Sequence, residues 1–189
     1  LALAAIAMYE PLHALPDAAA LLERGFPAAL DDVLTQQLRE PLQERELRAA
    51  IPRLTPIDDD VSQRVRRQYE ENPYPRWVDV AGGVEPVALE QHLRAMFPDA
   101  APTPLANSAA IEVLVAGCGT GYHAIATAQK YRGAQVLGVD LSLASLAYAQ
   151  RKTPAALAAR MNYAQADILK LGDQRGQLGG LDLGGHVGS

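Results

Sequence analysis

Three glycines within five residues directly follow a short apolar run, and such a turn can bring a ligand close to the backbone. The apolar run covers residues 111–116, and Gly117, Gly119 and Gly121 come after it. Glycine carries no Cβ, so a ligand can approach the turn closely, and N–H groups that face it can bind polar atoms. A tight turn without a ligand would show the same spacing. A bound ligand is the favoured interpretation because the run before the glycines is typical of a buried strand.

Two acidic residues end the next two strand-like segments. Asp140 ends the segment 134–140, and Asp167 ends a weaker segment, 162–167. A carboxylate at the end of the second strand can accept hydrogen bonds from both hydroxyls of a ribose, and an acid after the third strand would lie near the base. Alternatively, Asp140 caps the following helix and Asp167 is an acid of a surface loop. Together with the glycine turn, the two acids favour a nucleoside-type ligand.

The spacing of the glycines bears on which nucleotide could bind. The dinucleotide fingerprint G-x-G-x-x-G requires glycine at its sixth position. Here that position is Tyr122, and the third glycine, Gly121, comes one residue early. A nicotinamide-dependent oxidoreductase is therefore a disfavoured alternative.

The elements that must position these residues alternate between strands and helices. Helical segments at 122–131 and 143–152 separate the three strand-like segments, and Ser142 can cap the second helix. This order predicts an α/β fold, a doubly wound parallel sheet of the Rossmann-like kind. Only the first half of such a sheet is predicted, because no convincing fourth strand follows residue 171.

An all-helical N-terminal region precedes this half-sheet. Residues 1–52 are rich in alanine and leucine, and prolines divide them into short helices. Further helices are predicted from about 56 to 70 and over 85–97. The predicted organisation is a helical region with a linker at 1–110, a ligand-binding half-domain at 111–171, and a glycine-rich tail at 172–189. We expect the tail to be disordered, because so many glycines do not suit a packed strand or helix.

One short segment between two of these helices cannot be helical. Pro73 and Pro75 stand two residues apart, and each restricts the residue before it. The surrounding aromatic residues, Tyr69, Tyr74 and Trp77, could pack as a strut or form a lid over the ligand. The sequence leaves both interpretations open.

Three short motifs resemble a known family. They are VLVAGCGTG at residues 113–121, GVDLS at 138–142 and ADIL at 166–169. Together they closely resemble the first three motifs of class I methyltransferases, which use S-adenosylmethionine as cofactor, and the resemblance covers about residues 111–171. It implies a Rossmann-like class I core and a methyltransferase activity with an unknown methyl acceptor.

The resemblance also implies roles for single residues. Those assigned to the cofactor are Gly117, Gly119, Gly121, Asp140, Leu141, Asp167 and Ile168. The glycines would pass close to the methionine part of S-adenosylmethionine, and Asp140 would bind the ribose hydroxyls with Leu141 beside the adenine. Asp167 would face the adenine amino group with the Ile168 backbone next to it. No catalytic residue is implied, because the family usually places acceptor-side residues in later motifs.

A further segment, residues 68–77, resembles bacterial methyltransferases whose full-length forms often carry tetratricopeptide repeats. Those repeats would lie ahead of Leu1. Since later motifs and strands are not evident, we expect a truncated chain or a shifted reading frame after residue 171. The wall of the cofactor site opposite the glycine turn would then be missing. On that basis we expect weak or no cofactor binding and self-association through an open sheet edge.

Charge and composition narrow the partners. The net charge of −5 disfavours DNA and makes RNA a less favoured methyl acceptor than a small molecule or a protein. No apolar stretch is long enough for a membrane span. The single cysteine, Cys118, fits a reducing cytoplasm and has no paired histidine, so we expect a packing residue rather than a nucleophile. His123 is expected to be a bystander, and no histidine spacing indicates a metal site.

Two functional hypotheses therefore follow from the sequence. The first is an S-adenosylmethionine-dependent methyltransferase with an unknown acceptor. If the chain is truncated, this hypothesis includes an inactive form. The second is a non-catalytic module that binds a nucleoside or S-adenosylmethionine on a helical scaffold. An intact acceptor site would distinguish the first from the second.

Overall fold

The structure is a computed structural model that describes residues 2–80, 82, 85–99 and 110–174. The chain divides into two compact units, Leu1–Ala50 and Ile51–Ser189. The second unit contains the sheet and every residue discussed below as part of a site. Each unit is described by itself.

The first unit is all-helical, as the sequence predicted. Its elements are α1 (Ala2–Ala7), η1 (Leu12–Ala14), η2 (Ala18–Glu23), α2 (Ala28–Leu34), the π-helical η3 (Thr35–Arg39) and α3 (Glu40–Ala50). Leu12, Leu34 and Leu38 form its core with Ala18. The side chain of Gln37 connects two turns, since its Nε2 donates to the Ala7 carbonyl and its Oε1 accepts from the Leu12 amide.

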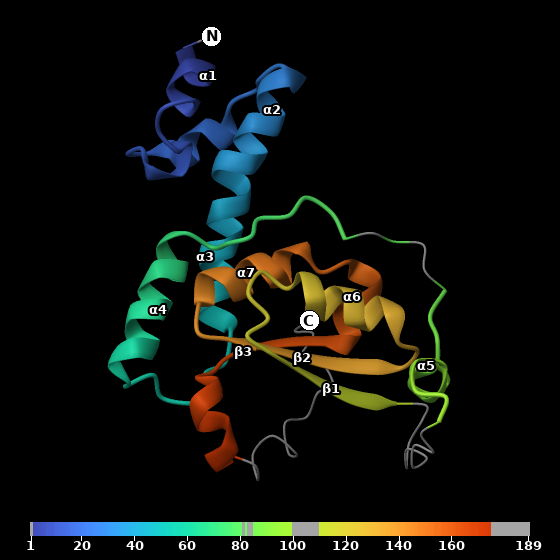
Figure 1. The fold of residues 1–189 in the computed structure, drawn as a ribbon. Helices are drawn as coiled ribbons and strands as arrows, with labels where there is room; N and C mark the ends of the chain where they lie inside the picture. Colours follow the sequence, from blue (N-terminus) through green and yellow to red (C-terminus); the bar gives the residue numbers. More distant parts are fainter. Residues whose placement is uncertain (1, 81, 83–84, 100–109, 175–189) are drawn as a thin grey trace. The chain divides into compact units, whose positions relative to one another are not determined.

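The second unit is built on a three-stranded parallel sheet with the order β1-β2-β3. The strands are β1 (Ile111–Ala116), β2 (Ala134–Asp140) and β3 (Met161–Gln165). Helices α6 (Tyr122–Lys130) and α7 (Leu143–Lys152) lie together on one face of the sheet (Figure 1). A short 3-10 helix, η4 (Ala155–Arg160), leads into β3. The predicted alternation of strands and helices, and the Rossmann-like fold class, are confirmed.

The two faces of the sheet are covered differently. Alanines of α6 and α7 pack on one face, beside Tyr163 of β3. On the other, Leu137 and Val139 of β2 pack against Leu54 and against Leu171 of the 3-10 helix η5 (Ile168–Gln174). Burial of both faces explains why β2 reads as a nearly continuous apolar run.

The compact sheet unit begins at Ile51, much earlier than the start of the half-domain at residue 111 expected from the sequence. Its first residues run beside β3: the Leu54 amide donates to the Gln165 carbonyl, and the Gln165 amide donates to the Pro52 carbonyl. This short parallel pairing covers the outer edge of β3. Apolar patterning could not reveal it, because only a few residues take part.

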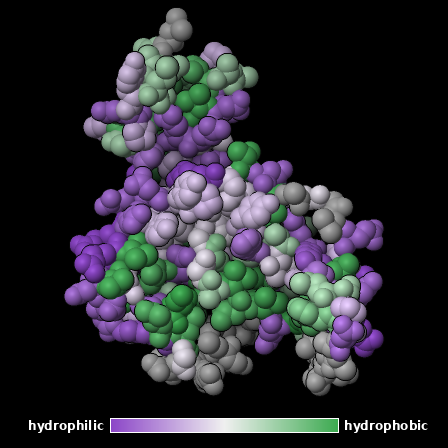
Figure 2. Space-filling view, viewed as in Figure 1, coloured by the Kyte–Doolittle hydropathy of each residue, from purple (hydrophilic) through white to green (hydrophobic). Residues whose placement is uncertain are grey.

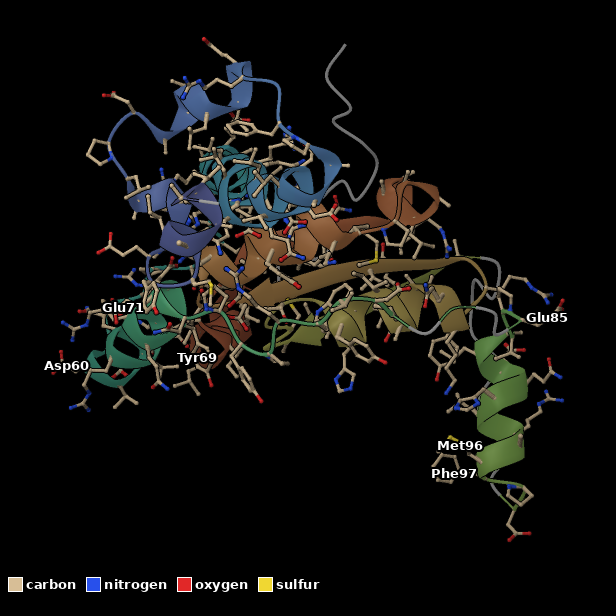
Figure 3. All side chains as sticks on the ribbon, turned by 90° about the horizontal axis from the view of Figure 1, so that it is seen from above. Asp60, Tyr69, Glu71, Glu85, Met96 and Phe97 are labelled. Carbon is tan, nitrogen blue, oxygen red and sulfur yellow. The ribbon has the colours of Figure 1, made fainter. Side chains whose placement is uncertain are left out.

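Two helices of the region before the sheet also belong to this unit. Helix α4 (Asp60–Glu71) begins later than residue 56, because Asp59 is its N-cap and accepts hydrogen bonds from the Val61 and Ser62 amides. Helix α5 (Leu89–Met96) stands beyond the end of α6, and Figure 3 shows Met96 and the C-cap Phe97 at the end of α5 that is farther from the sheet. Most of the expected linker and tail lie outside the described residues.

Candidate functional site

A cavity of about 540 Å³ opens at the carboxyl ends of β1 and β2. This volume lies in the range of small-molecule and cofactor sites. The residues that line it come from α4, the loop after it, the glycine turn, α6, the β2 end, α7 and η5. They are Val65, Tyr69, Tyr74, Pro75, Trp77, Gly117, Cys118, Gly119, Thr120, Tyr122, His123, Asp140, Leu141, Ser145 and Ile168.

Two of the three glycines present open backbone to this cavity. Gly117 and Gly119 have φ angles of 67° and 53°, in the left-handed region that favours glycine. A Cβ added to Gly117 would meet no atom within 4 Å, and one added to Gly119 would lie 4.0 Å from the Tyr74 carbonyl oxygen. A ligand can therefore approach the backbone at both positions.

The third glycine, Gly121, has a different position. It is buried and is not among the residues that line the cavity. A Cβ at Gly121 would lie 2.5 Å from the Cβ of Ala149 on α7 and 3.1 Å from its Cα. Gly121 thus allows α6 to start directly against α7, which is a packing role.

The carboxylate of Asp140 connects the ends of β1 and β2. Its Oδ2 accepts a hydrogen bond of 2.9 Å from the Gly119 amide, and its Oδ1 accepts one of 2.9 Å from the Ser142 amide. Each carboxylate oxygen can accept more than one hydrogen bond, so both remain able to bind ligand hydroxyls. Asp140 therefore lines the cavity and also holds the glycine turn. The alternative that it is only a helix cap does not fit, because Ser142 is the N-cap of α7.

The amides of the glycine turn are largely used within the chain. The Cys118 amide donates to the Val139 carbonyl, and the Gly121 amide donates to the Cys118 carbonyl. With the Gly119 amide bound to Asp140, three amides of the turn are engaged internally. A turn that binds pyrophosphate would direct such amides at the ligand instead.

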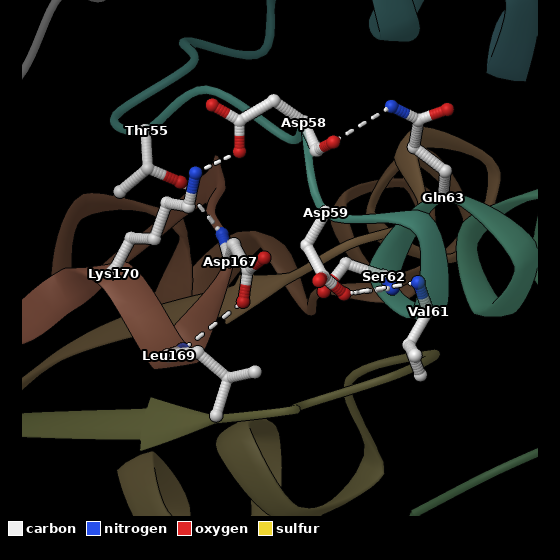
Figure 4. A network of polar contacts seen from close by, with 9 residues as sticks. All are labelled: Thr55, Asp58, Asp59, Val61, Ser62, Gln63, Asp167, Leu169 and Lys170. Atoms are coloured by element: carbon white, nitrogen blue, oxygen red, sulfur yellow. Dashed lines mark hydrogen bonds and ion pairs between the residues drawn. The ribbon is translucent and has the colours of Figure 1, made fainter.

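Asp167 is buried, with 1% of its surface exposed, and lies in a network of polar contacts with Thr55 and Leu169 (Figure 4). Its amide donates to the Thr55 hydroxyl at 2.7 Å, and its Oδ1 accepts from the Leu169 amide at 3.0 Å. Its Oδ2 is buried without a hydrogen-bond partner among the described residues. A buried carboxylate oxygen without a donor is costly, but Asp167 is not among the residues that line the cavity. Ile168, the next residue, lines the cavity.

The segment after α4 forms one wall of the cavity and is hydrogen-bonded to the glycine turn. The Thr120 hydroxyl donates to the Pro75 carbonyl at 2.6 Å, and the Trp77 indole donates to the Thr120 carbonyl at 3.0 Å. The Tyr148 hydroxyl donates to the Trp77 carbonyl. The segment is therefore both a strut fixed to the turn and a cover of the cavity, so the two interpretations of the sequence are not exclusive.

Helix α4 supplies two wall residues, of which sequence reasoning considered Tyr69 as part of a lid and did not consider Val65. Val65 and Tyr69 are four residues apart on the same helix face, and Figure 3 shows Tyr69 near the Glu71 end of α4. Glu70 joins this helix to the site, because its Oε1 accepts a hydrogen bond from the Leu143 amide at the start of α7. The signal was a stripe of apolar residues at positions 61, 65 and 69 in an otherwise charged helix.

Apolar side chains gather around the cavity on the face shown in Figure 2, over α4, η5 and β1. Exposed residues there include Val61 of α4, Ile168 and Leu169 of η5, and Leu114 of β1.

Across the parts of the chain that the structure describes, no helix has the length and apolar character to cross a membrane. In those same parts, no group of three or more histidine, cysteine or acidic side chains could hold a metal ion.

The single thiol is held in its neutral form. Burial raises the pKa of Cys118, and the nearby charge of Asp140 raises it further. Its Sγ lies 3.7 Å from the Gly119 carbonyl oxygen. A neutral, buried thiol is a poor nucleophile, so Cys118 packs the turn, as the sequence predicted.

We expect Cys118 to resist alkylation. Iodoacetamide at pH 8 should modify the folded chain more than about tenfold more slowly than the chain in denaturant, because the reactive thiolate is disfavoured. The pKa of the thiol is higher in the folded chain than in the unfolded chain. The free energy of unfolding should therefore fall above about pH 9, where the thiol ionises only in the unfolded chain. Mass spectrometry measures both rates, and equal rates would contradict the assignment.

Comparison with known proteins finds a family for part of the second unit. Residues 113–179 match the family model described as a methyltransferase domain. The glycine turn and most of the parallel sheet lie within these residues, so this part of the chain is similar to methyltransferase domains. The resemblance of residues 68–77 to bacterial methyltransferases with tetratricopeptide repeats stays a prediction.

The comparisons with whole proteins are less informative. No curated protein matches the chain. Among solved structures, the chain is similar to coclaurine N-methyltransferase bound to N-methylheliamine and SAH, with 18% sequence identity and a TM-score of 0.31. The match covers 89% of this chain and 51% of that chain. The chain thus spans about half the length of that methyltransferase.

Proposed function

We propose that this chain binds S-adenosylmethionine in the cavity and acts in methyl transfer to an acceptor. The observation that carries the proposal is the carboxylate of Asp140, which stands at the end of β2, binds the Gly119 amide and faces the cavity. A ribose placed there would meet a hydrogen-bond acceptor, and the open backbone of Gly117 would leave room for the methionine part.

The chemistry of the lining supports this cofactor over a dinucleotide. Among the described residues that line the cavity there is one carboxylate and no lysine or arginine. A pyrophosphate would find neither a cationic side chain nor the amides of Cys118, Gly119 and Gly121, which donate within the chain. A ligand with a positive charge and a ribose fits this environment better.

In this proposal the protein acts mainly by positioning. The bound cofactor supplies an electrophilic methyl group on a sulfonium. Asp140 would hold the ribose, and Leu141 and Ile168 would contact the adenine. The wall from Tyr69 to Trp77 would exclude water. Such alignment of an acceptor with the methyl carbon accelerates a displacement strongly, with effective molarities of about 10⁵ M or more.

The second candidate is a binding module without catalysis. It is favoured by the small number of groups that could take a proton from an acceptor. Of the described lining residues, His123 is the single imidazole, and the carboxylate of Asp140 already accepts two amide hydrogen bonds. A transfer assay with binding as its control separates the two candidates.

The acceptor is proposed to be a small molecule or a protein rather than RNA, since the chain carries a net charge of −5. The single, buried cysteine agrees with a cytoplasmic location. Self-association along β1 stays a prediction, because within the described residues no strand pairs with its outer edge.

We expect the chain to bind S-adenosylmethionine and S-adenosylhomocysteine and not a nicotinamide dinucleotide. A ligand present at about 100 times its dissociation constant should add about 2.7 kcal/mol to the free energy of unfolding. Thermal unfolding, followed by the fluorescence of Trp77, the single tryptophan, reports on the second unit. Stabilisation by the dinucleotide alone would contradict the proposal, and binding without transfer of a labelled methyl group would favour the second candidate.

A further inference from the structure

Three tyrosines from three separate elements meet at the cavity. Tyr69 belongs to α4, Tyr74 to the segment after it, and Tyr122 to the first turn of α6. Their exposed fractions are 36%, 73% and 40%. An aromatic ring that lines a cavity and remains this exposed can still offer a face to a ligand.

The segment that carries Tyr74 is fixed directly above the glycine turn. The Tyr74 carbonyl oxygen lies 4.0 Å from the position that a Cβ on Gly119 would take. The neighbouring Pro75 carbonyl accepts a hydrogen bond from the Thr120 hydroxyl. Trp77 is fixed by hydrogen bonds at both its indole and its carbonyl. The Trp77 ring and the backbone at Tyr74 and Pro75 are therefore held in place before any ligand binds.

Two other aromatic rings near the turn, those of Trp77 and Tyr148, already bind cations of the chain itself. Lys152 Nζ lies 5.5 Å from the Trp77 ring centre, and the Arg76 and Arg151 guanidiniums lie 5.4 and 5.0 Å from that of Tyr148. None of these cations is among the residues that line the cavity. The cavity thus combines aromatic rings and the Asp140 carboxylate without a positive side chain from the described residues.

We propose that Tyr69, Tyr74 and Tyr122, which we call the aromatic wall, bind the positive charge of the ligand and so distinguish the sulfonium of S-adenosylmethionine from the neutral thioether of S-adenosylhomocysteine. Aromatic faces attract organic cations electrostatically, and more so when water is excluded. The inference rests on the proposed function, because it assumes that the methionine part lies at the glycine turn. Its consequence is that the product, having lost the charge, leaves the site more easily than the cofactor.

The test uses Tyr74, whose side chain is exposed and can be changed without cost to the core. Calorimetry measures the dissociation constants of both ligands for the chain and for Tyr74→Leu, with Tyr74→Phe as the matched control that keeps the ring. Tyr74→Leu should weaken S-adenosylmethionine binding by about five- to tenfold, the effect of one partly desolvated cation–ring contact. Binding of S-adenosylhomocysteine should change less than about twofold, and Tyr74→Phe should resemble the parent chain.

An analogue with an ammonium group in place of the sulfonium provides a second arm, and its affinity should fall with that of S-adenosylmethionine. Equal losses for the charged and neutral ligands, or no loss for either, would overturn the role of the aromatic wall while leaving the proposed function intact. If the folded parent chain binds neither cofactor nor product, the proposed function itself fails, and this inference fails with it.

Discussion

Replacing Asp140 by alanine should weaken the binding of S-adenosylmethionine by about 1.5–3 kcal/mol, a loss of roughly 10- to 100-fold in affinity. The carboxylate faces the cavity and has lone pairs left for two ribose hydroxyls, so its removal leaves those hydroxyls without an acceptor. The Gly119 amide would lose its partner as well. The loss should therefore be near the upper end of the range, and calorimetry measures it.

Two variants make this prediction specific. Asp140→Asn keeps one acceptor oxygen and the shape of the side chain, so its loss should be intermediate. Asp79→Ala removes the same charge from an exposed position outside the cavity, and its affinity should equal that of the parent chain. The Asp140→Ala variant must be folded, with an unfolding transition like that of the parent chain. An unchanged dissociation constant in such a variant would exclude Asp140 as a ribose ligand.

Replacing Gly121 by alanine should destabilise the second unit by about 2–5 kcal/mol. A left-handed conformation costs a residue with a Cβ about 1–2 kcal/mol, and Gly121 has a φ of 86°. Overpacking adds about 1–3 kcal/mol, because the new Cβ would lie 2.5 Å from the Cβ of Ala149. Such a loss is a large part of the stability of an ordinary domain. Urea unfolding followed by Trp77 fluorescence measures it.

Gly117→Ala is the matched control for this experiment. Gly117 has a similar φ of 67°, but a Cβ there would meet no atom within 4 Å. Its variant should lose only the backbone contribution of about 1–2 kcal/mol, while its methyl group would point toward the ligand site. Equal unfolding free energies for the two variants would show that Gly121 is not a packing residue.

The contrast between these glycines shows how one motif serves two purposes. Spacing alone assigns Gly117, Gly119 and Gly121 to the ligand together. In the structure only the first two line the cavity, whereas the third permits α6 to contact α7. A spacing pattern records that a Cβ is not tolerated, and it does not record whether a ligand or a neighbouring helix excludes it.

The sequence analysis left open whether the segment around Pro73 and Pro75 covers the cavity. It assigned the wall to strands beyond the first half of the sheet and expected weak binding in their absence. The segment from Val65 to Trp77 lines the cavity instead. Its hydrogen bonds join residues more than 40 positions apart, such as Trp77 with Thr120, and local patterning carries no signal for such pairs.

The sequence by itself determined the order of strands and helices around the glycine turn and placed Asp140 at the carboxyl end of β2. Apolar runs, glycine spacing and caps act over a few residues, so they can be read without knowledge of the fold. Only the tertiary structure decided that residues 51–55 run beside β3, that Asp167 is buried with one oxygen unpartnered, and that aromatic side chains of α4 and the following segment cover the turn. Those features depend on contacts between distant parts of the chain, whose geometry is set by packing on the sheet.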